Sequence, residues 1–109
     1  MRNAAQWLDL FKRYKNIRSD YKLADHWHVS QSRISQYRSG RLKLPLAFML
    51  EIAEECGRDP LGIIVSLAYP KAREQDKPGL SDVYWRVAVS GIMHEMRVNS
   101  LPSGWRPRR

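Results

Sequence analysis

The sequence predicts an all-α protein, with five short helices followed by a longer sixth helix. Apolar residues recur three and four positions apart along most of the chain. Capping residues, prolines and glycines interrupt this pattern where helices are expected to begin and end. Residues 63–69 could pass locally for a strand, but the residues that flank them indicate a helix. The length of 109 residues suits one compact domain.

The first two predicted helices cover residues 4–16 and 20–27, and each has one apolar face. In the first helix, lysine and arginine side chains occupy the outside. Ser19 or Asp20 is a suitable N-cap for the second helix. The residues that form the two apolar faces are Trp7, Leu8, Phe11, Leu23, Ala24 and Trp27.

The third predicted helix, residues 31–39 (QSRISQYRS), has an unusual composition. Ser30 is its N-cap, and Gly40 follows as a C-terminal glycine in the left-handed conformation. Ile34 is its only aliphatic residue, and none of its side chains is acidic. We expect Ile34 and Tyr37 to mark the buried side of this helix, which leaves amides, hydroxyls and guanidiniums outside. Such a surface suits a partner that is negatively charged and rich in hydrogen-bonding edges.

Prolines mark the starts of the fourth and fifth predicted helices. Pro45 precedes the fourth helix, and Gly57 ends it. Asp59 and Pro60 begin the fifth helix, which continues over residues 61–69. The apolar stripe of the fourth helix consists of Phe48, Met49, Ile52, Ala53 and Cys56. Because this cysteine is the only one in the chain, no internal disulfide is possible, and we expect a small core residue here.

The chain after residue 70 is expected to divide into three parts. Residues 70–80 contain two prolines, a glycine and five charged residues, so we expect a linker over 71–80 after a domain formed by 1–70. Residues 81–98 have the pattern of one long helix. Residues 99–109 show no periodicity and are predicted to be a basic, flexible tail.

The charge of the chain favours an anionic partner. Lysine and arginine number 19 against 11 acidic residues, a net charge of +8, which favours nucleic acid ahead of a lipid surface. Residues 1–50 hold ten basic and three acidic side chains, whereas the sign reverses over 51–59. Asp9 and Lys12 interrupt the N-terminus too early for a signal peptide. No run approaches the roughly 18 apolar residues of a membrane span, so we expect a soluble, cytoplasmic protein with no membrane partner.

Residues 23–37 combine the features of two steeply crossing helices joined by a tight turn. A small residue, Ala24, lies in the helix of residues 20–27 where the helix of residues 31–39 would touch it. Val29 lies in the turn, and together with Ile34 it would hold the helix of residues 31–39 against the core.

The pattern LADHWHVSQSRISQYRSGRLKLP, followed by MLEIAEECGRDP, resembles the lambda repressor/Cro family of helix-turn-helix DNA-binding proteins, over roughly residues 5–68. The resemblance implies a five-helix, lambda-repressor-like DNA-binding domain, here with an additional C-terminal helix. It also implies a bacterial, nucleoid-associated regulator of transcription, most simply a phage or prophage repressor. His28 occupies the turn position where this family usually has glycine, and histidine tolerates a positive φ better than most residues.

The family's binding mode places the helix of residues 31–39 in the major groove of double-stranded DNA. Glutamine can pair with adenine there, and arginine with guanine. The residues expected to read bases are Gln31, Ser32, Arg33, Ser35 and Gln36. The residues expected to contact phosphates are Arg18, Ser30, Arg38, Arg41 and Lys43.

The last predicted helix carries more apolar surface than one packed stripe requires. Either it docks on the five-helix domain, or a second copy of the chain covers it. Because a two-fold dimer on a palindromic operator is the usual solution for such proteins, we expect a homodimer. The residues expected to form it are Tyr84, Val87, Ala88, Ile92 and Met96. The alternative function is an antitoxin of the same fold, whose C-terminal segment binds a protein partner.

Other functions have little support in the sequence. It shows no Ser/His/Asp grouping, no glycine-rich phosphate loop and no paired carboxylates, so we expect neither an enzyme nor a small-molecule substrate. No cofactor is implied. His26 and His28 lack a third ligand nearby, so no metal site is expected. An RNA reader would need an exposed aromatic platform, which Trp105 alone does not supply.

Overall fold

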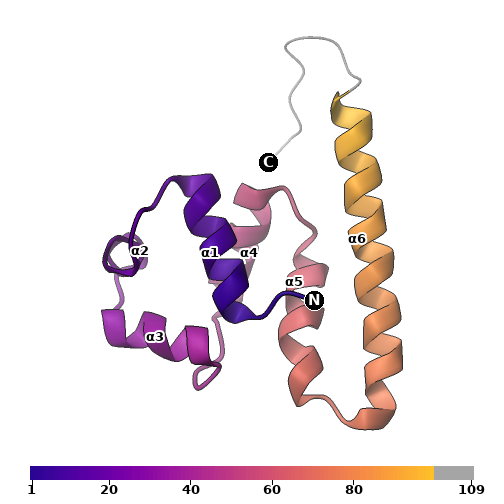
Figure 1. Cartoon of the computed structure of the whole chain (residues 1–109), viewed down its shortest axis with the longest axis horizontal. Coiled ribbons are helices and arrows are strands. Elements are labelled where there is room, and N and C mark those ends of the chain that lie inside the picture. Colours follow the sequence, from indigo (N-terminus) through magenta and orange to yellow (C-terminus); the bar gives the residue numbers. More distant parts are fainter. Residues whose placement is uncertain (100–109) are drawn as a thin grey trace.

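The computed structural model describes the backbone of residues 1–99 and the side-chain surroundings of residues 1–88. Residues 1–99 form α-helices and two short 3-10 helices and include no strand, which confirms the all-α prediction (Figure 1). The elements are α1 Ala4–Lys15, α2 Asp20–Trp27, α3 Gln31–Ser39, α4 Leu46–Cys56, α5 Pro60–Ala68, η1 Tyr69–Lys71, η2 Glu74–Asp76 and α6 Lys77–Asn99.

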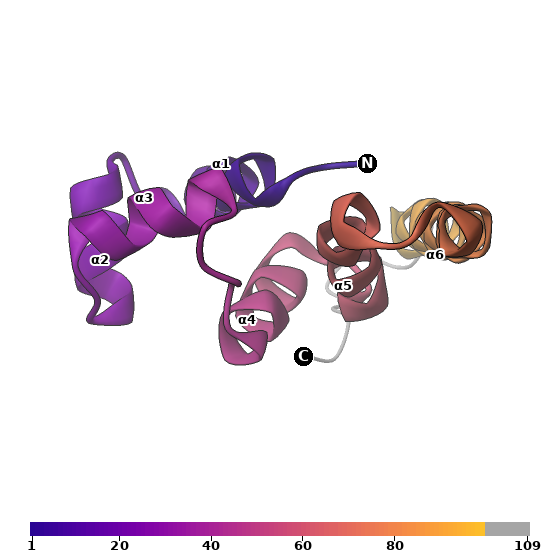
Figure 2. The same ribbon diagram turned by 90° about the horizontal axis from the view of Figure 1, so that it is seen from below.

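The helices are arranged around α1. Figure 1 shows α2 and α3 to one side of α1, and α5 and α6 running side by side on the other. Seen from below, α4 lies on the face opposite the N-terminal segment and next to α5 (Figure 2). Both α2 and α1 pack against α3, so α3 is held from two directions.

Local capping chemistry explains where most of the helices begin and end. Asn3 and Gln6 form a reciprocal capping box at the start of α1, with hydrogen bonds of 2.8 and 2.9 Å. The Ser19 hydroxyl accepts a hydrogen bond from the backbone N–H of Lys22 (3.1 Å), so Ser19 is the N-cap of α2. The helices α1 to α4 each end at a residue in the left-handed conformation; these are Asn16, His28, Gly40 and Gly57.

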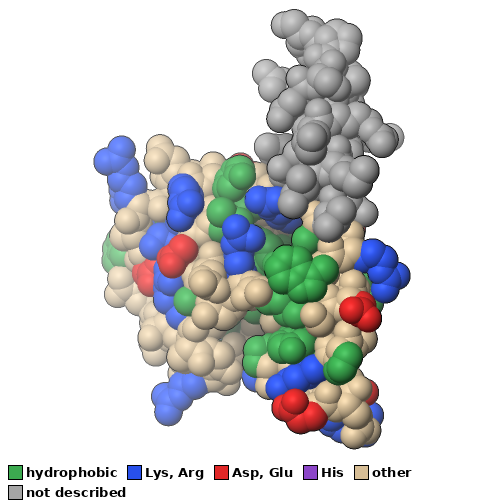
Figure 3. All heavy atoms as spheres, turned by 45° about the vertical axis from the view of Figure 1, so that its right-hand side comes forward, with side chains coloured by type: hydrophobic (Ala, Val, Ile, Leu, Met, Phe, Trp, Pro, Cys, Tyr) green, Lys and Arg blue, Asp and Glu red, His purple; other side chains and the backbone are tan. Residues whose placement is uncertain are grey.

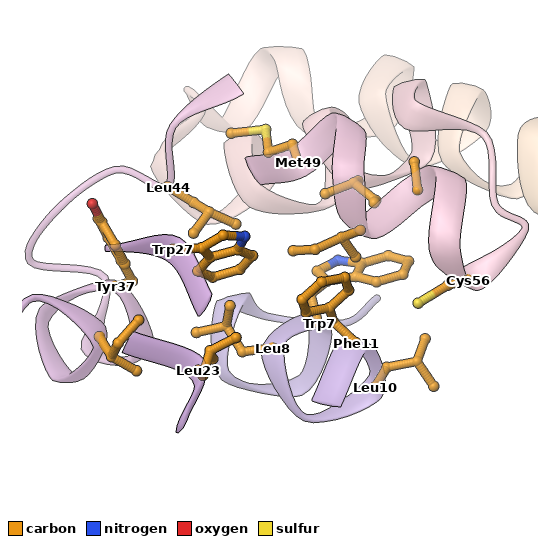
Figure 4. Packing of buried hydrophobic residues seen from close by; sticks show 14 of the residues in the cluster. Trp7, Leu8, Leu10, Phe11, Leu23, Trp27, Tyr37, Leu44, Met49 and Cys56 are labelled. Carbon is orange, nitrogen blue, oxygen red and sulfur yellow. The ribbon is translucent and has the colours of Figure 1, made fainter. Parts of the chain in front are cut away.

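Stacked aromatic rings connect three helices in the core. Trp27 of α2 lies between Phe11 of α1 and Phe48 of α4, with ring centroids 5.3 and 4.2 Å apart and the planes nearly parallel. Figure 4 shows Trp27 and Phe11 among the other buried side chains of α1, α2 and α4. Trp7 continues this core towards α5, because its indole N–H donates to the buried hydroxyl of Ser66 (2.7 Å).

The segment before the last helix is more regular than expected. α6 begins at Lys77, earlier than the predicted start at residue 81, and the expected linker contains the last residue of η1, all of η2 and the first turn of α6. Pro78 fits in this first turn because the N–H that proline lacks has no partner there in any helix. The predicted tail lies, apart from residue 99, outside the described residues. None of the helices in the described part of the chain is long and apolar enough to cross a lipid bilayer.

Candidate nucleic-acid interface

α2 and α3 are joined by a three-residue turn that relies on a left-handed histidine. His28 has φ 55° and ψ 42°, as expected for the position that the resemblance assigns to glycine. Its N–H donates to the carbonyl of Asp25 (3.2 Å), and the N–H of Val29 donates to that of Ala24 (2.9 Å). These bonds satisfy the end of α2 and turn the chain within a few residues.

Only one side of α3 packs against the rest of the protein. Ile34 is 0% exposed and Tyr37 is 3% exposed, and the Tyr37 ring packs edge-on against Phe48 at 6.2 Å. Val29 in the turn packs against the same core. At the start of the helix, the Ser30 hydroxyl accepts a hydrogen bond from the N–H of Arg33 (3.1 Å). The anchors and the N-cap predicted for this helix are therefore confirmed.

The other side of α3 carries the five residues that were predicted to read bases. Gln31, Ser32, Arg33 and Ser35 are exposed, and Gln36 is half-buried. Within the part of the chain whose side chains are described, none of these five side chains takes part in a hydrogen bond or ion pair. Their donors and acceptors are therefore available to a partner.

Exposed basic side chains also lie in the segments next to α2 and α3. Arg41 and Lys43 are exposed in the loop that follows Gly40, and Leu44 is buried and fixes that loop to the core. Arg18 is exposed in the connection between α1 and α2. The side chain of Ser30 caps α3, so its hydroxyl already accepts a hydrogen bond from the protein.

The structure differs from the prediction that Arg38 contacts a phosphate, because the guanidinium of Arg38 is directed into the protein. It donates twice to the carboxylate of Asp20, at 2.8 Å each, and once to Asp9 at 2.7 Å. Asp20 also accepts from Lys12 at 2.9 Å. The guanidinium of Arg38 holds the pKa of Asp20 at about 2, and Asp20 in turn raises the pKa of Arg38. Arg38 therefore ties α3 to α1 and to the start of α2.

Three of the residues predicted to form dimer contacts are partly or fully covered by their own chain. Tyr84 is buried, and Val87 and Ala88 are half-buried, within a single chain. α6 packs closely along α5, and a Cβ placed on Gly62 would lie 3.6 Å from a methyl carbon of Val87. This face of α6 therefore docks on the chain's own α5, which was the other explanation open for its apolar residues. The side chains of Ile92 and Met96 lie outside the described residues.

His26 makes a contact between two helices. His26 Nε2 lies 2.7 Å from a carboxylate oxygen of Glu51 and joins α2 to α4. Within the described part of the chain, no group of three or more His, Cys, Asp and Glu side chains could hold a metal ion.

Comparison with known proteins adds no relative. No family model, no curated protein and no solved structure matches this chain. The geometry and charge of α3 and its surroundings are therefore the features that bear on function.

Proposed function

We propose that this protein is a helix-turn-helix regulator of transcription that binds a specific sequence in double-stranded DNA, as a phage or prophage repressor does. The observation that carries the proposal is the two-sided character of α3. Ile34 and Tyr37 hold the helix to the core, while its opposite side presents uncharged polar and basic groups. The resemblance to the lambda repressor/Cro family points to the same function.

The exposed side of α3 fits the chemistry of base edges in the major groove. That groove is about 12 Å wide and admits one α-helix. Gln31 and Gln36 can each offer a donor and an acceptor to adenine, and Arg33 can donate twice to guanine. Each good contact of this kind contributes about 1–3 kcal/mol of discrimination between bases.

The start of α2 supports a phosphate contact once the charge of Asp20 is considered. A helix N-terminus attracts an anion, but a carboxylate in the first turn would repel it. Arg38 and Lys12 both form ion pairs with Asp20, so its negative charge is compensated. Arg41 and Lys43 in the loop after α3, and Arg18 before α2, are exposed basic groups that can contact phosphates next to the helix proposed to enter the groove.

Repression would follow from occupying an operator and excluding RNA polymerase. A two-fold homodimer on a palindromic operator is part of the proposal, because one copy of α3 spans only a few base pairs. Because α6 packs along α5, we propose that the dimer uses another surface. Leu46 and Leu50 of α4 and Leu61 and Ile64 of α5 are exposed aliphatic residues on two adjacent helices.

Selection of bound sequences from a random pool of duplex DNA tests this function. We expect enrichment of one motif, with two related half-sites if the dimer is correct. Binding of that motif by Gln31→Ala and Arg33→Ala variants should then lose base preference at separate positions, with the fold unchanged. Gln75→Ala and Arg73→Ala are matched controls, because both residues are exposed near η2. Absence of an enriched motif, or equal selectivity in all four variants, would refute the proposal.

A further inference from the structure

A cleft of about 640 Å³ lies between the N-terminal segment, the start of α5 and α6. Its walls include Arg2 and Trp7 on one side, Arg58 at the end of the α4–α5 connection, and Trp85 of α6. None of the residues assigned to DNA contact lines it. Figure 3 shows hydrophobic side chains next to lysine and arginine side chains on the side of the molecule where α6 comes forward. A cleft of this volume is in the range, about 300–1,000 Å³, that holds small ligands.

The electrostatic character of this cleft is positive. Arg2 lies over the ring of Trp7, with its guanidinium carbon 5.2 Å from the ring centroid. Arg2 and Arg58 are both close enough to Cys56 to lower the pKa of its thiol, although burial dominates and raises that pKa to about 11. Two guanidiniums, those of Arg2 and Arg58, therefore belong to residues that line the cleft.

Among the described residues that line the cleft, the acidic one is Asp59, which caps α5. A carboxylate oxygen of Asp59 accepts a hydrogen bond from the N–H of Leu61 at 2.9 Å, as the N-cap of α5. Among the described residues no carboxylate forms an ion pair with Arg2, which is half-buried. A half-buried cation without a carboxylate partner favours an incoming anion.

The apolar part of the cleft is aromatic. Trp85 is 55% exposed and packs edge-on against buried Tyr84, with ring centroids 5.1 Å apart. This contact restrains the Trp85 ring and leaves much of its surface open to solvent. A flat ring laid against this indole would remove apolar surface of both from water.

We propose that this cleft binds a planar aromatic anion, such as an aromatic carboxylate, with its ring against Trp85 and its negative group on Arg2. The site is separate from the proposed DNA-binding surface, and the inference does not depend on DNA binding. A neutral aromatic compound would leave Arg2 without a counter-charge, and an aromatic cation would be repelled by both guanidiniums. A second copy of the chain would instead cover Trp85 without requiring an anion.

Titration of the full chain with 2-naphthoate, followed by calorimetry, tests the proposal. We expect saturable binding of one ligand per chain, and roughly tenfold weaker binding of 2-naphthamide, which has the same shape without the charge. The indole N–H signals of Trp7 and Trp85 should shift in NMR spectra, and that of Trp27, which lies in the core between α1 and α4, should not.

Two variants and two matched controls locate the site. Arg2→Gln and Trp85→Ala should each weaken 2-naphthoate binding by roughly fivefold or more. Arg73→Gln and Tyr21→Ala should leave it unchanged, because these exposed residues lie away from the cleft. Failure to saturate at millimolar 2-naphthoate would overturn the proposal. Equal binding of 2-naphthamide, equal effects of all four variants, or a stoichiometry of one ligand per two chains would overturn it as well.

Discussion

Replacement of Arg38 by methionine tests how α3 is held in place. The guanidinium of Arg38 joins carboxylates on α1 and α2, through Asp9 and both oxygens of Asp20. Methionine keeps an unbranched apolar side chain but removes the positive charge and the hydrogen-bond donors of arginine. Arg38→Met therefore removes the cation that joins these two carboxylates, while Lys12 still pairs with Asp20.

The pKa of Asp20 sets the magnitude of this effect. A fall from the usual value of 3.8 to about 2 corresponds to about 2.4 kcal/mol if the interaction is unscreened. Because 38% of the Asp20 side chain is exposed, solvent screening reduces its share to about 1 kcal/mol. The second carboxylate and the lost hydrogen bonds add to this, so we expect Arg38→Met to lower the free energy of unfolding by about 1–2 kcal/mol at neutral pH.

The dependence on pH has a definite sign. The pKa of Asp20 is lower in the folded than in the unfolded protein, so its stabilising effect is complete above about pH 4 and is lost as the pH falls towards 2. The variant lacks most of this effect at every pH. The difference in unfolding free energy between the wild type and Arg38→Met should therefore shrink as the pH falls from about 5 to 2.

Urea unfolding followed by circular dichroism at several pH values measures this difference. Arg33→Met is the matched control, because Arg33 is on the same helix and exposed. We expect the control to change stability by less than about 0.5 kcal/mol at every pH. A difference for Arg38→Met that stays constant between pH 5 and 2, or that equals the control, would show that the Arg38–Asp20 pair does not stabilise the protein.

The remaining predictions concern the loop, the turn and the core. Lys43→Ala should weaken binding to all DNA sequences and reduce the slope of log affinity against log salt by about one unit; an unchanged slope would remove Lys43 from the phosphate contacts. His28→Gly should raise the free energy of unfolding by about 0.5–1 kcal/mol, measured with urea, because glycine adopts a φ of 55° without strain; destabilisation would contradict this. Ser66→Ala should lower it by about 1–3 kcal/mol and shift the melting temperature downwards, since the buried indole N–H of Trp7 loses its acceptor; an unaltered melting temperature would argue against that role.

The features that could be predicted from the sequence are those governed by neighbouring residues. α3 begins after Ser30 because the serine hydroxyl accepts a hydrogen bond from an N–H group of the first turn. It ends at Gly40 because glycine adopts the left-handed conformation. The buried side of α3 followed from the positions of Ile34 and Tyr37 among polar residues. Because these two residues face the core, most of the proposed base-reading side chains are exposed.

The features that escaped prediction depend on residues far apart in the chain. Arg38 is 18 positions from Asp20 and 29 from Asp9, so no local pattern distinguishes it from an exposed arginine. One signal was present, because Asp9 and Asp20 are two of the three acidic residues among the first 50. The surface that Tyr84 and Val87 pack against could not be predicted either. An apolar stripe does not indicate whether its own chain or a second copy of the chain will cover it.

The division of α3 into an anchored side and an exposed side has a consequence for how the protein could change over time. Substitutions at exposed positions usually alter stability by less than about 0.5 kcal/mol, whereas losses at buried positions such as Ile34 cost several times more. Gln31, Ser32, Arg33 and Ser35 can therefore be exchanged in combination while the scaffold persists. Under the proposed DNA-binding function, a library randomised at these four positions would sample new target preferences on one unchanged framework.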